Sequence, residues 1–268
     1  MDLSSPKVMG ILNVTPDSFY DGNRYFSEAK IRDRIEAMIE EGADIIDIGA
    51  VSSRPGADMF DEDTEWKRLH KVLPLIKNYL TKICFSIDTF RAIIAQRAVR
   101  EFGIGMINDI SAGNMDEMMF QTVANLNVPY VMMHMQGTPQ TMQDNPEYDN
   151  VSQDVIRYFA EKVAKLKLLG VNDIIIDPGF GFGKTIDHNY QLMRELNNFK
   201  IFDLPILVGV SRKSMIFRLL NITPEESLPG TIVLNTMALL QGANILRVHD
   251  VREAAQAVAI IEKCKPVV

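Results

Sequence analysis

Cysteine is scarce in this sequence: its 268 residues include only Cys84 and Cys264. Neither belongs to a Cys-x-x-Cys pair or to a Cys/His cluster, so neither a disulfide framework nor a structural zinc site is indicated. Two reduced thiols are what we expect of a cytoplasmic protein.

Long apolar runs and an excess of positive charge are also absent. No stretch reaches the roughly 18 apolar residues that a membrane span needs, and residues 1–14 lack the basic and apolar regions of an export signal. The 28 Lys and Arg residues are outnumbered by 35 Asp and Glu residues, which gives a net charge of −7. We therefore expect no membrane partner, and no nucleic-acid partner whose affinity depends on phosphate neutralisation.

Short β-rich runs alternate with amphipathic helical patterns along the whole sequence. The predicted strands are residues 8–13, 44–48, 83–88, 105–109, 129–134, 173–177, 205–211 and 244–249. The predicted helices are residues 29–41, 62–79, 90–102, 115–125, 151–169, 187–199, 229–242 and 251–263. The strands are apolar nearly throughout, which is typical of parallel strands covered on both faces. Eight such units predict a (β/α)8 TIM barrel, α/β in class, as a single domain over residues 1–268.

Three connections after predicted strands are long: residues 14–26, 49–61 and 135–150. Each follows the C-terminal end of a strand, the end of a TIM barrel where active sites lie. Loops longer than about 12 residues are more often functional than incidental, so we expect these loops to take part in a site.

Each predicted strand has a polar residue at or near its C-terminal end. These residues are Asn13, Asp47, Asp88, Asn108, His134, Asp177, Ser211 and His249. A single residue of this kind is most simply a turn or capping residue. Because the eight strand ends of a barrel converge on one opening, the whole set favours an active site there.

Three of these residues, Asp88, Asn108 and Asp177, offer acceptors and an amide without a neighbouring nucleophile. A carboxylate can accept two N–H bonds from the amino-pyrimidinone edge of a pterin, and an amide can bind the adjacent nitrogen and oxygen. Lys213 and Arg247 lie at the last two strands, where TIM barrels often bind phosphate. The alternative for both cations is an ordinary solvated or salt-bridged side chain.

Residues 177–185 read DPGFGFGKT and come close to a phosphate-binding loop. That motif needs a glycine five residues before Gly183, where this sequence has Pro178. We therefore expect anion binding elsewhere, and we expect Lys184 to be solvated.

The ordered motifs along the chain resemble those of the bacterial dihydropteroate synthase family. They are MGILNVTPDSF (9–19), GADIIDIG (42–49), SSRPG (52–56), SIDTF (86–90), INDISAG (107–113), MHMQGTPQTMQ (133–143), DPGFGFGK (177–184), GVSRKS (209–214) and RVHD (247–250). The resemblance implies a barrel that condenses 6-hydroxymethyl-7,8-dihydropterin pyrophosphate with p-aminobenzoate. The implied products are 7,8-dihydropteroate and pyrophosphate, the cofactor is Mg²⁺, and the assembly is a homodimer.

The resemblance also implies roles for individual residues. The pterin is bound by Asp88, Asn108, Asp177, Phe182, Lys213 and Arg247. Pyrophosphate is bound by Asn13, Arg54, Arg247 and His249, with Asn13 as the Mg²⁺ ligand. The p-aminobenzoate site and its loops comprise Phe19, Asp21, Ser53, Arg54, Pro55 and Ser214. The implied mechanism is dissociative, and its catalytic residues are Asp88, Asn108, Asp177, Lys213, Arg247 and His249.

The second long loop departs from the family pattern at Ser53, where threonine is common. The change keeps the hydroxyl group and removes a methyl group. It therefore bears on the packing of the loop and on the response to sulfonamides, which are the family's p-aminobenzoate mimics.

Two other functions fit part of the pattern. A pterin barrel of the methyltetrahydrofolate methyltransferase type shares the Asp/Asn grip on the ring but binds no pyrophosphate. The set of Asn13, Lys213, Arg247 and His249 argues against it. A catalytically silent pterin-binding paralogue is expected to lose loop or anion-binding residues, and none is lost in this sequence.

Overall fold

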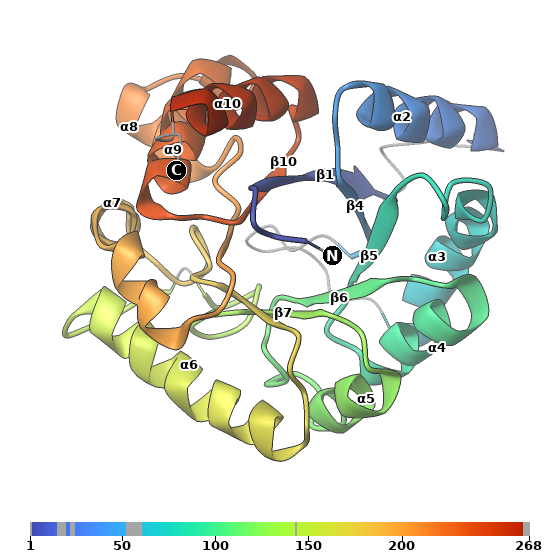
Figure 1. Ribbon diagram of the computed structural model, residues 1–268, viewed down its shortest axis with the longest axis horizontal. Helices are drawn as coiled ribbons and strands as arrows, with labels where there is room; N and C mark the ends of the chain where they lie inside the picture. Colours follow the sequence, from blue (N-terminus) through green and yellow to red (C-terminus); the bar gives the residue numbers. More distant parts are fainter. Residues whose placement is uncertain (1, 15–19, 22–24, 52–60, 143, 265–268) are drawn as a thin grey trace.

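Eight parallel strands form a barrel in the computed structural model, which describes residues 2–14, 20–21, 25–51, 61–142 and 144–264 (Figure 1). They are β1 (Lys7–Asn13), β4 (Ile45–Gly49), β5 (Cys84–Asp88), β6 (Met106–Asp109), β7 (Tyr130–Met133), β8 (Ile174–Asp177), β9 (Leu207–Val208) and β10 (Ile245–Val248). Their order in the sheet is β8-β7-β6-β5-β4-β1-β10-β9. A parallel bridge between Ile176 and Ile206 joins the two edges, so the predicted (β/α)8 TIM barrel is confirmed.

Helices surround the barrel and connect its strands (Figure 1). The α-helices are α2 (Glu28–Glu40), α3 (Glu62–Ile76), α4 (Ala92–Phe102), α5 (Met119–Leu126), α6 (Val151–Leu168), α7 (Ile186–Arg194), α8 (Ser214–Leu220), α9 (Leu228–Gln241) and α10 (Val251–Cys264). The shorter elements are the 3-10 helices η1 (Leu196–Phe202) and η2 (Glu225–Ser227) and the hairpin of β2 (Tyr20–Asp21) with β3 (Tyr25–Phe26). None of the described helices is long and apolar enough to cross a membrane.

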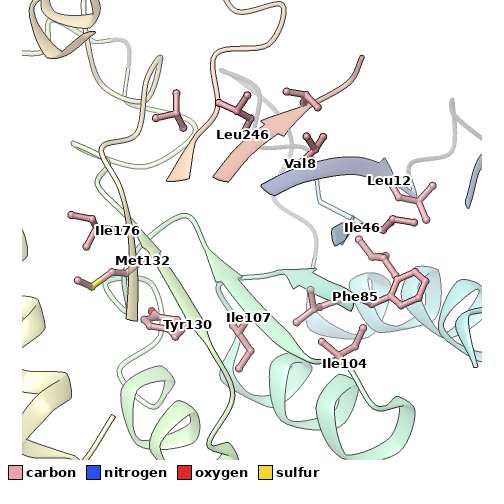
Figure 2. Packing of buried hydrophobic residues seen from close by; sticks show 14 of the residues in the cluster. Val8, Leu12, Ile46, Phe85, Ile104, Ile107, Tyr130, Met132, Ile176 and Leu246 are labelled. Atoms are coloured by element: carbon pink, nitrogen blue, oxygen red, sulfur yellow. The ribbon is translucent and has the colours of Figure 1, made fainter. Parts of the chain in front are cut away.

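Successive residues of each strand face alternately into the barrel and out toward the helices. Outward residues such as Val8, Ile46 and Leu246 belong to the large core between strands and helices (Figure 2). The inward residues near the N-terminal ends form a separate inner core of Met9, Ile45, Met106, Val131, Ile175, Leu207 and Ile245. The barrel is therefore filled by apolar side chains at one end, and its next inward positions lie closer to the opposite opening.

The seventh strand and the helices beside it differ from the sequence prediction. The sequence predicts a strand over residues 205–211, but β9 covers only Leu207–Val208. The chain turns soon afterwards, since the Lys213 N–H donates to the Val210 carbonyl and Arg212 has a φ of 54°. The seven-residue helix α8 is absent from the prediction because so short a segment shows little periodicity. The predicted helix 187–199 is in fact α7 followed by η1.

Candidate active site

Inward-facing polar side chains from different strands gather directly above the inner core. Four of them lie two residues after a member of that core, on β4, β6, β8 and β10: Asp47, Asn108, Asp177 and Arg247. A fifth, Asp88, ends β5 and is the register partner of Asn108. The barrel thus brings together residues that are up to 200 positions apart in the chain.

Arg247 is the centre of a hydrogen-bonded cluster with two acidic side chains. Its Nε donates to Asp47 Oδ2 and its Nη2 donates to Asp88 Oδ2, both at 2.7 Å. Asn108 Nδ2 donates to the same Asp47 oxygen at 2.9 Å. Among the described residues, Nη1 of Arg247 has no hydrogen-bond partner, so this part of the guanidinium is available to an anion.

Burial and neighbouring charges both shift the pKa values of Asp88 and Arg247. Burial raises the pKa of Asp88 to about 7, while the Arg247 guanidinium opposes the shift and the Asp47 carboxylate adds to it. Burial alone would lower the pKa of Arg247, but the Asp47 and Asp88 carboxylates raise that pKa above its usual value. Asp88 therefore exchanges its proton near neutral pH, whereas Arg247 remains a fixed cation.

Asp177 begins the glycine-rich loop, whose path depends on Gly179. Asp177 Oδ1 accepts the Gly179 N–H at 2.8 Å. Gly179 has a φ of 72°, and a Cβ atom there would lie 1.9 Å from the carbonyl oxygen of His134, so only glycine fits. Burial raises the pKa of Asp177, while the nearby Lys213 ammonium opposes the shift.

Lys213 connects the turn after β9 to the glycine-rich loop. Its Nζ donates to the Phe180 carbonyl at 2.6 Å and lies 4.6 Å from the centre of the Phe182 ring, a cation–π contact. Burial lowers the pKa of Lys213 to about 8, and the Asp177 carboxylate opposes that shift. The structure therefore places Asp177, Phe182 and Lys213 together.

Lys184 is buried, so the sequence-based expectation that it is solvated is wrong. The residue is 3% exposed, and its Nζ donates to the carbonyls of Gly179 and Phe182 at 2.9 Å each. The same nitrogen lies 2.9 Å from Nδ1 of His134. Buried carbonyl groups need donors, and Lys184 supplies one for this loop. The glycine pattern could have pointed to such a donor, but it does not show which way the carbonyls face.

Ser211 holds His249, a contact that the sequence does not reveal. The Ser211 hydroxyl oxygen accepts the backbone N–H of His249 at 3.2 Å and lies 3.0 Å from its Nδ1. These two contacts hold the His249 ring at the position directly after β10. The neighbouring Arg212 is instead paired with Asp250 through hydrogen bonds of 3.0 and 2.7 Å.

The remaining sequence-predicted residues lie beside this cluster or outside the described residues. Asn13 is an exposed residue at the end of β1, and Ser214 begins α8 directly after Lys213. Outside the described residues lie Phe19, Ser53, Arg54 and Pro55, together with the side chain of Asp21. In the described part of the chain, no group of three or more His, Cys, Asp or Glu side chains is arranged to hold a metal ion.

Comparison with known proteins identifies the family. The model of the family described as "Pterin binding enzyme" matches residues 9–249. The chain belongs to the pterin-binding enzyme family. It is 42% identical over 266 residues to the dihydropteroate synthase of Escherichia coli (strain K12), a match that covers 98% of this chain and 93% of that protein.

Solved structures of similar proteins share the fold of this pterin-binding family member. A Yersinia pestis dihydropteroate synthase in complex with a sulfonamide drug has a TM-score of 0.89 and 40% identity, covering 98% of this chain and 95% of that one. A Xanthomonas albilineans dihydropteroate synthase with 4-aminobenzoic acid has a TM-score of 0.88 and 37% identity, covering 99% and 96%. The barrel of this family member is thus a fold on which related chains bind small aromatic ligands.

Proposed function

We propose that this protein is a transferase that condenses 6-hydroxymethyl-7,8-dihydropterin pyrophosphate with p-aminobenzoate. The products are 7,8-dihydropteroate and pyrophosphate, in folate biosynthesis. The observation that carries the proposal is the gathering of Asp88, Asn108, Asp177 and Lys213 on the inner side of a pterin-binding barrel. Relatives that match nearly the whole chain are dihydropteroate synthases.

The acceptors in this group match the donors of a pterin ring. The 2-amino group and N3–H of the ring form an edge of two parallel N–H donors, which a carboxylate can accept. Asp177 offers Oδ2 and the second lone pair of Oδ1, because Oδ1 already accepts the Gly179 N–H. Asn108 presents Oδ1 as an acceptor, because its Nδ2 is bound to Asp47. The Lys213 ammonium lies 4.6 Å from the centre of the Phe182 ring, which belongs to the loop that Asp177 begins.

The leaving pyrophosphate is proposed to bind Arg247, His249, Arg54 and Asn13. Nη1 of Arg247 is a suitable donor for its oxygens, and a ring N–H of His249 is assigned the same role. Mg²⁺ fits this site only together with the substrate, since the described residues form no acidic metal cluster and Asn13 offers one amide oxygen. Such coordination is ordinary for Mg²⁺, which keeps several waters and binds substrate phosphates. When bound, Mg²⁺ offsets negative charge on the pyrophosphate.

The proposed mechanism is dissociative. The bond between the pterin methylene carbon and the pyrophosphate oxygen breaks first, and its electron pair leaves with pyrophosphate. The amino group of p-aminobenzoate then forms the new C–N bond and loses a proton. The charged groups of the site suit this order of steps, because Arg247 stabilises the departing anion while the carboxylates of Asp88 and Asp177 stabilise the cationic pterin.

We also propose that residues of the first two long loops, together with Ser214 at the start of α8, bind p-aminobenzoate. The residues assigned to this site are Phe19, Asp21, Ser53, Arg54, Pro55 and Ser214. Loop closure over the site would exclude water from the pterin cation. Sulfonamides are expected to compete with p-aminobenzoate here. The homodimer and the cytoplasmic location stay predictions, the first from the family resemblance and the second from the two free cysteines.

Matched binding experiments test the pyrophosphate assignment. Arg247→Lys keeps a positive charge beside Asp47 and Asp88 but loses the planar fork that presents Nη1. We expect affinity for dihydropterin pyrophosphate to fall at least about tenfold, the loss of one charge-assisted hydrogen bond, with little change for a pterin that lacks pyrophosphate. Arg157→Lys on α6 is the control, because the Arg157 side chain is 71% exposed. Equal loss of both ligands would contradict the pyrophosphate role.

The same titrations separate the proposal from its alternatives. A pterin barrel of the methyltransferase type would bind the simple pterin and the pyrophosphate ester with similar affinity. A silent paralogue would prefer the pyrophosphate ester but release no product from it.

A further inference from the structure

Asp47 is a buried carboxylate in the site to which the proposed reaction assigns no role. Its side chain is 0% exposed, whereas those of Arg247 and Asp88 are 20% and 10% exposed. Asp47 therefore lies deeper in the barrel than the two charged neighbours that reach the surface of the opening.

One oxygen of Asp47 joins two residues of the site that come from distant parts of the chain. Asp47 Oδ2 accepts from Arg247 Nε at 2.7 Å and from Asn108 Nδ2 at 2.9 Å. In the sheet, β4 lies two strands from β6 on one side and two strands from β10 on the other. A single carboxylate thus ties together groups on both sides of the opening.

These bonds fix the direction in which each partner faces the opening. A carboxylate only accepts hydrogen bonds, so the Asn108 amide must turn Nδ2 toward Asp47 and Oδ1 away from it. The guanidinium of Arg247 is planar, so its bonds to Asp47 and Asp88 set the direction of Nη1. Without Asp47, the amide could flip and the guanidinium could pivot about its remaining bond to Asp88.

The second oxygen of Asp47 distinguishes this residue from an ordinary buried carboxylate. Among the described residues, Asp47 Oδ1 has no hydrogen-bond partner, and neither has the Oγ of Ser86, its register partner on β5. Asp109, a buried acid at the end of β6, instead accepts four hydrogen bonds, from Ser111, Gly113 and Tyr130. Incomplete pairing of a buried charge is unusual in a purely structural position and is expected at functional sites.

We propose that Asp47 is a positioning residue, which aligns the Asn108 amide with the pterin ring and the Arg247 guanidinium with the pyrophosphate. The inference rests on the proposed function, because both partners are assigned there. It extends that function because Asp47 contacts no substrate and acts by orienting Asn108 and Arg247.

Three variants separate orientation from charge and from folding. Asp47→Asn keeps one oxygen that can accept from both partners but removes the negative charge. Asp47→Ala removes both bonds, and Asp47→Ser, whose side chain is too short to keep both, takes its place if the alanine variant does not fold. Asp109→Asn is the matched control, a buried strand-end acid whose bonds lie outside the site. It should lower the melting temperature and leave kcat and KM of the folded protein unchanged.

We expect Asp47→Ala to lower kcat by about 100-fold, the size of effect that follows when reacting groups are misplaced by about 1 Å. KM for dihydropterin pyrophosphate should rise, and KM for p-aminobenzoate should change little. Asp47→Asn should recover activity to within about tenfold of the parent protein. Equal impairment of the asparagine and alanine variants would overturn the proposal, because charge rather than orientation would then be what Asp47 supplies. Unchanged kinetics in Asp47→Ala would also overturn it.

A ligand-free measurement keeps this inference separable from the proposed function. In NMR spectra, the Nε–H of Arg247 should be shifted downfield and protected from exchange with water, because it is bound to a buried carboxylate. Asp47→Ala should lose both features, and an unchanged Arg247 signal would overturn the positioning role. If the parent protein shows the protected signal but makes no dihydropteroate, the proposed function fails while the orientation of Arg247 by Asp47 stands.

Discussion

The ammonium nitrogen of Lys184 lies 2.9 Å from Nδ1 of His134, in the buried interior beside the glycine-rich loop. It also donates to the carbonyls of Gly179 and Phe182. Burial lowers the pKa of Lys184 to about 7, with the Asp177 carboxylate opposing the shift, and burial lowers the pKa of His134 well below its usual value. The close contact between His134 and Lys184 thus joins two buried side chains, and this pair supports the loop that carries Asp177 and Phe182.

Replacing Lys184 with methionine should destabilise the protein by removing the donor for two loop carbonyls. Each buried group left without a partner costs about 1–3 kcal/mol, so for two carbonyls we expect the free energy of unfolding to fall by about 2–6 kcal/mol. Pterin affinity should fall as well, because the loop would no longer be fixed. Urea unfolding measures the first effect, with the exposed Lys167→Met as the control. Equal stability of the two variants would contradict the role given to Lys184.

Alanine substitutions at Gly170 and Gly179 distinguish the cost of backbone strain from the cost of a steric clash. Their φ angles are 82° and 72°, but a Cβ at Gly170 would meet nothing within 4 Å, whereas one at Gly179 would lie 1.9 Å from the His134 carbonyl oxygen. Gly170→Ala should cost about 1–2 kcal/mol of stability and leave pterin binding intact. Gly179→Ala should lose pterin binding, because the loop must move to admit the methyl group. Calorimetric titration with a simple pterin checks this, and normal affinity in Gly179→Ala would contradict the loop geometry.

Asp177→Asn should abolish recognition of the pterin edge while leaving the fold intact. The amide oxygen can still accept the Gly179 N–H, but an NH2 group replaces Oδ2 and would face the donors of the ring. We expect affinity for dihydropterin pyrophosphate to fall by about 100-fold or more. Asp173→Asn, an exposed residue just before β8 at the opposite end of the barrel, should bind normally. Near-normal binding by Asp177→Asn would remove Asp177 from the pterin site.

Asp88 and Lys213 both have pKa values near neutral pH, which predicts a bell-shaped pH dependence of kcat/KM for dihydropterin pyrophosphate. The pKa of Asp88 is raised to about 7, so its carboxylate is populated above that pH and lost below it. The pKa of Lys213 is lowered to about 8, so its ammonium is populated below that pH and lost above it. Both charged forms coexist best between these values.

Lys213→Arg provides the check on the alkaline limb of this profile. Arginine stays charged throughout the accessible pH range, so the variant should keep the acid limb and lose the alkaline one. Steady-state kinetics across the range measure both limbs. A pH-independent kcat/KM in the parent protein would contradict the assigned titrations.

The barrel could be predicted from the sequence because its strands are short apolar runs separated by amphipathic helices. Runs such as residues 44–48 and 173–177 indicate burial on both faces, and the structure has β4 and β8 there. The predicted seventh strand is too long because apolar character continues to Val210, beyond Val208, the last residue that pairs in the sheet. Local patterns report burial well, but they do not report where hydrogen bonding between strands ends.

The site could be predicted in part. The positions of Asp88, Asn108, Asp177 and Arg247 follow from the rule that strand ends converge, and the structure brings them together. The pairing of Asp47 with Arg247, 200 residues away, depends on barrel closure and leaves no local signal. The burial of Lys184 leaves no local signal for a similar reason, since it depends on the path of the loop before it.

The most direct test of the proposed function is an assay of the purified protein with Mg²⁺, dihydropterin pyrophosphate and p-aminobenzoate that follows both products together. Dihydropteroate and pyrophosphate should appear in equal amounts. The Asp177→Asn variant should form no dihydropteroate. Binding of dihydropterin pyrophosphate without formation of dihydropteroate would contradict the synthase function and indicate a catalytically silent pterin-binding protein.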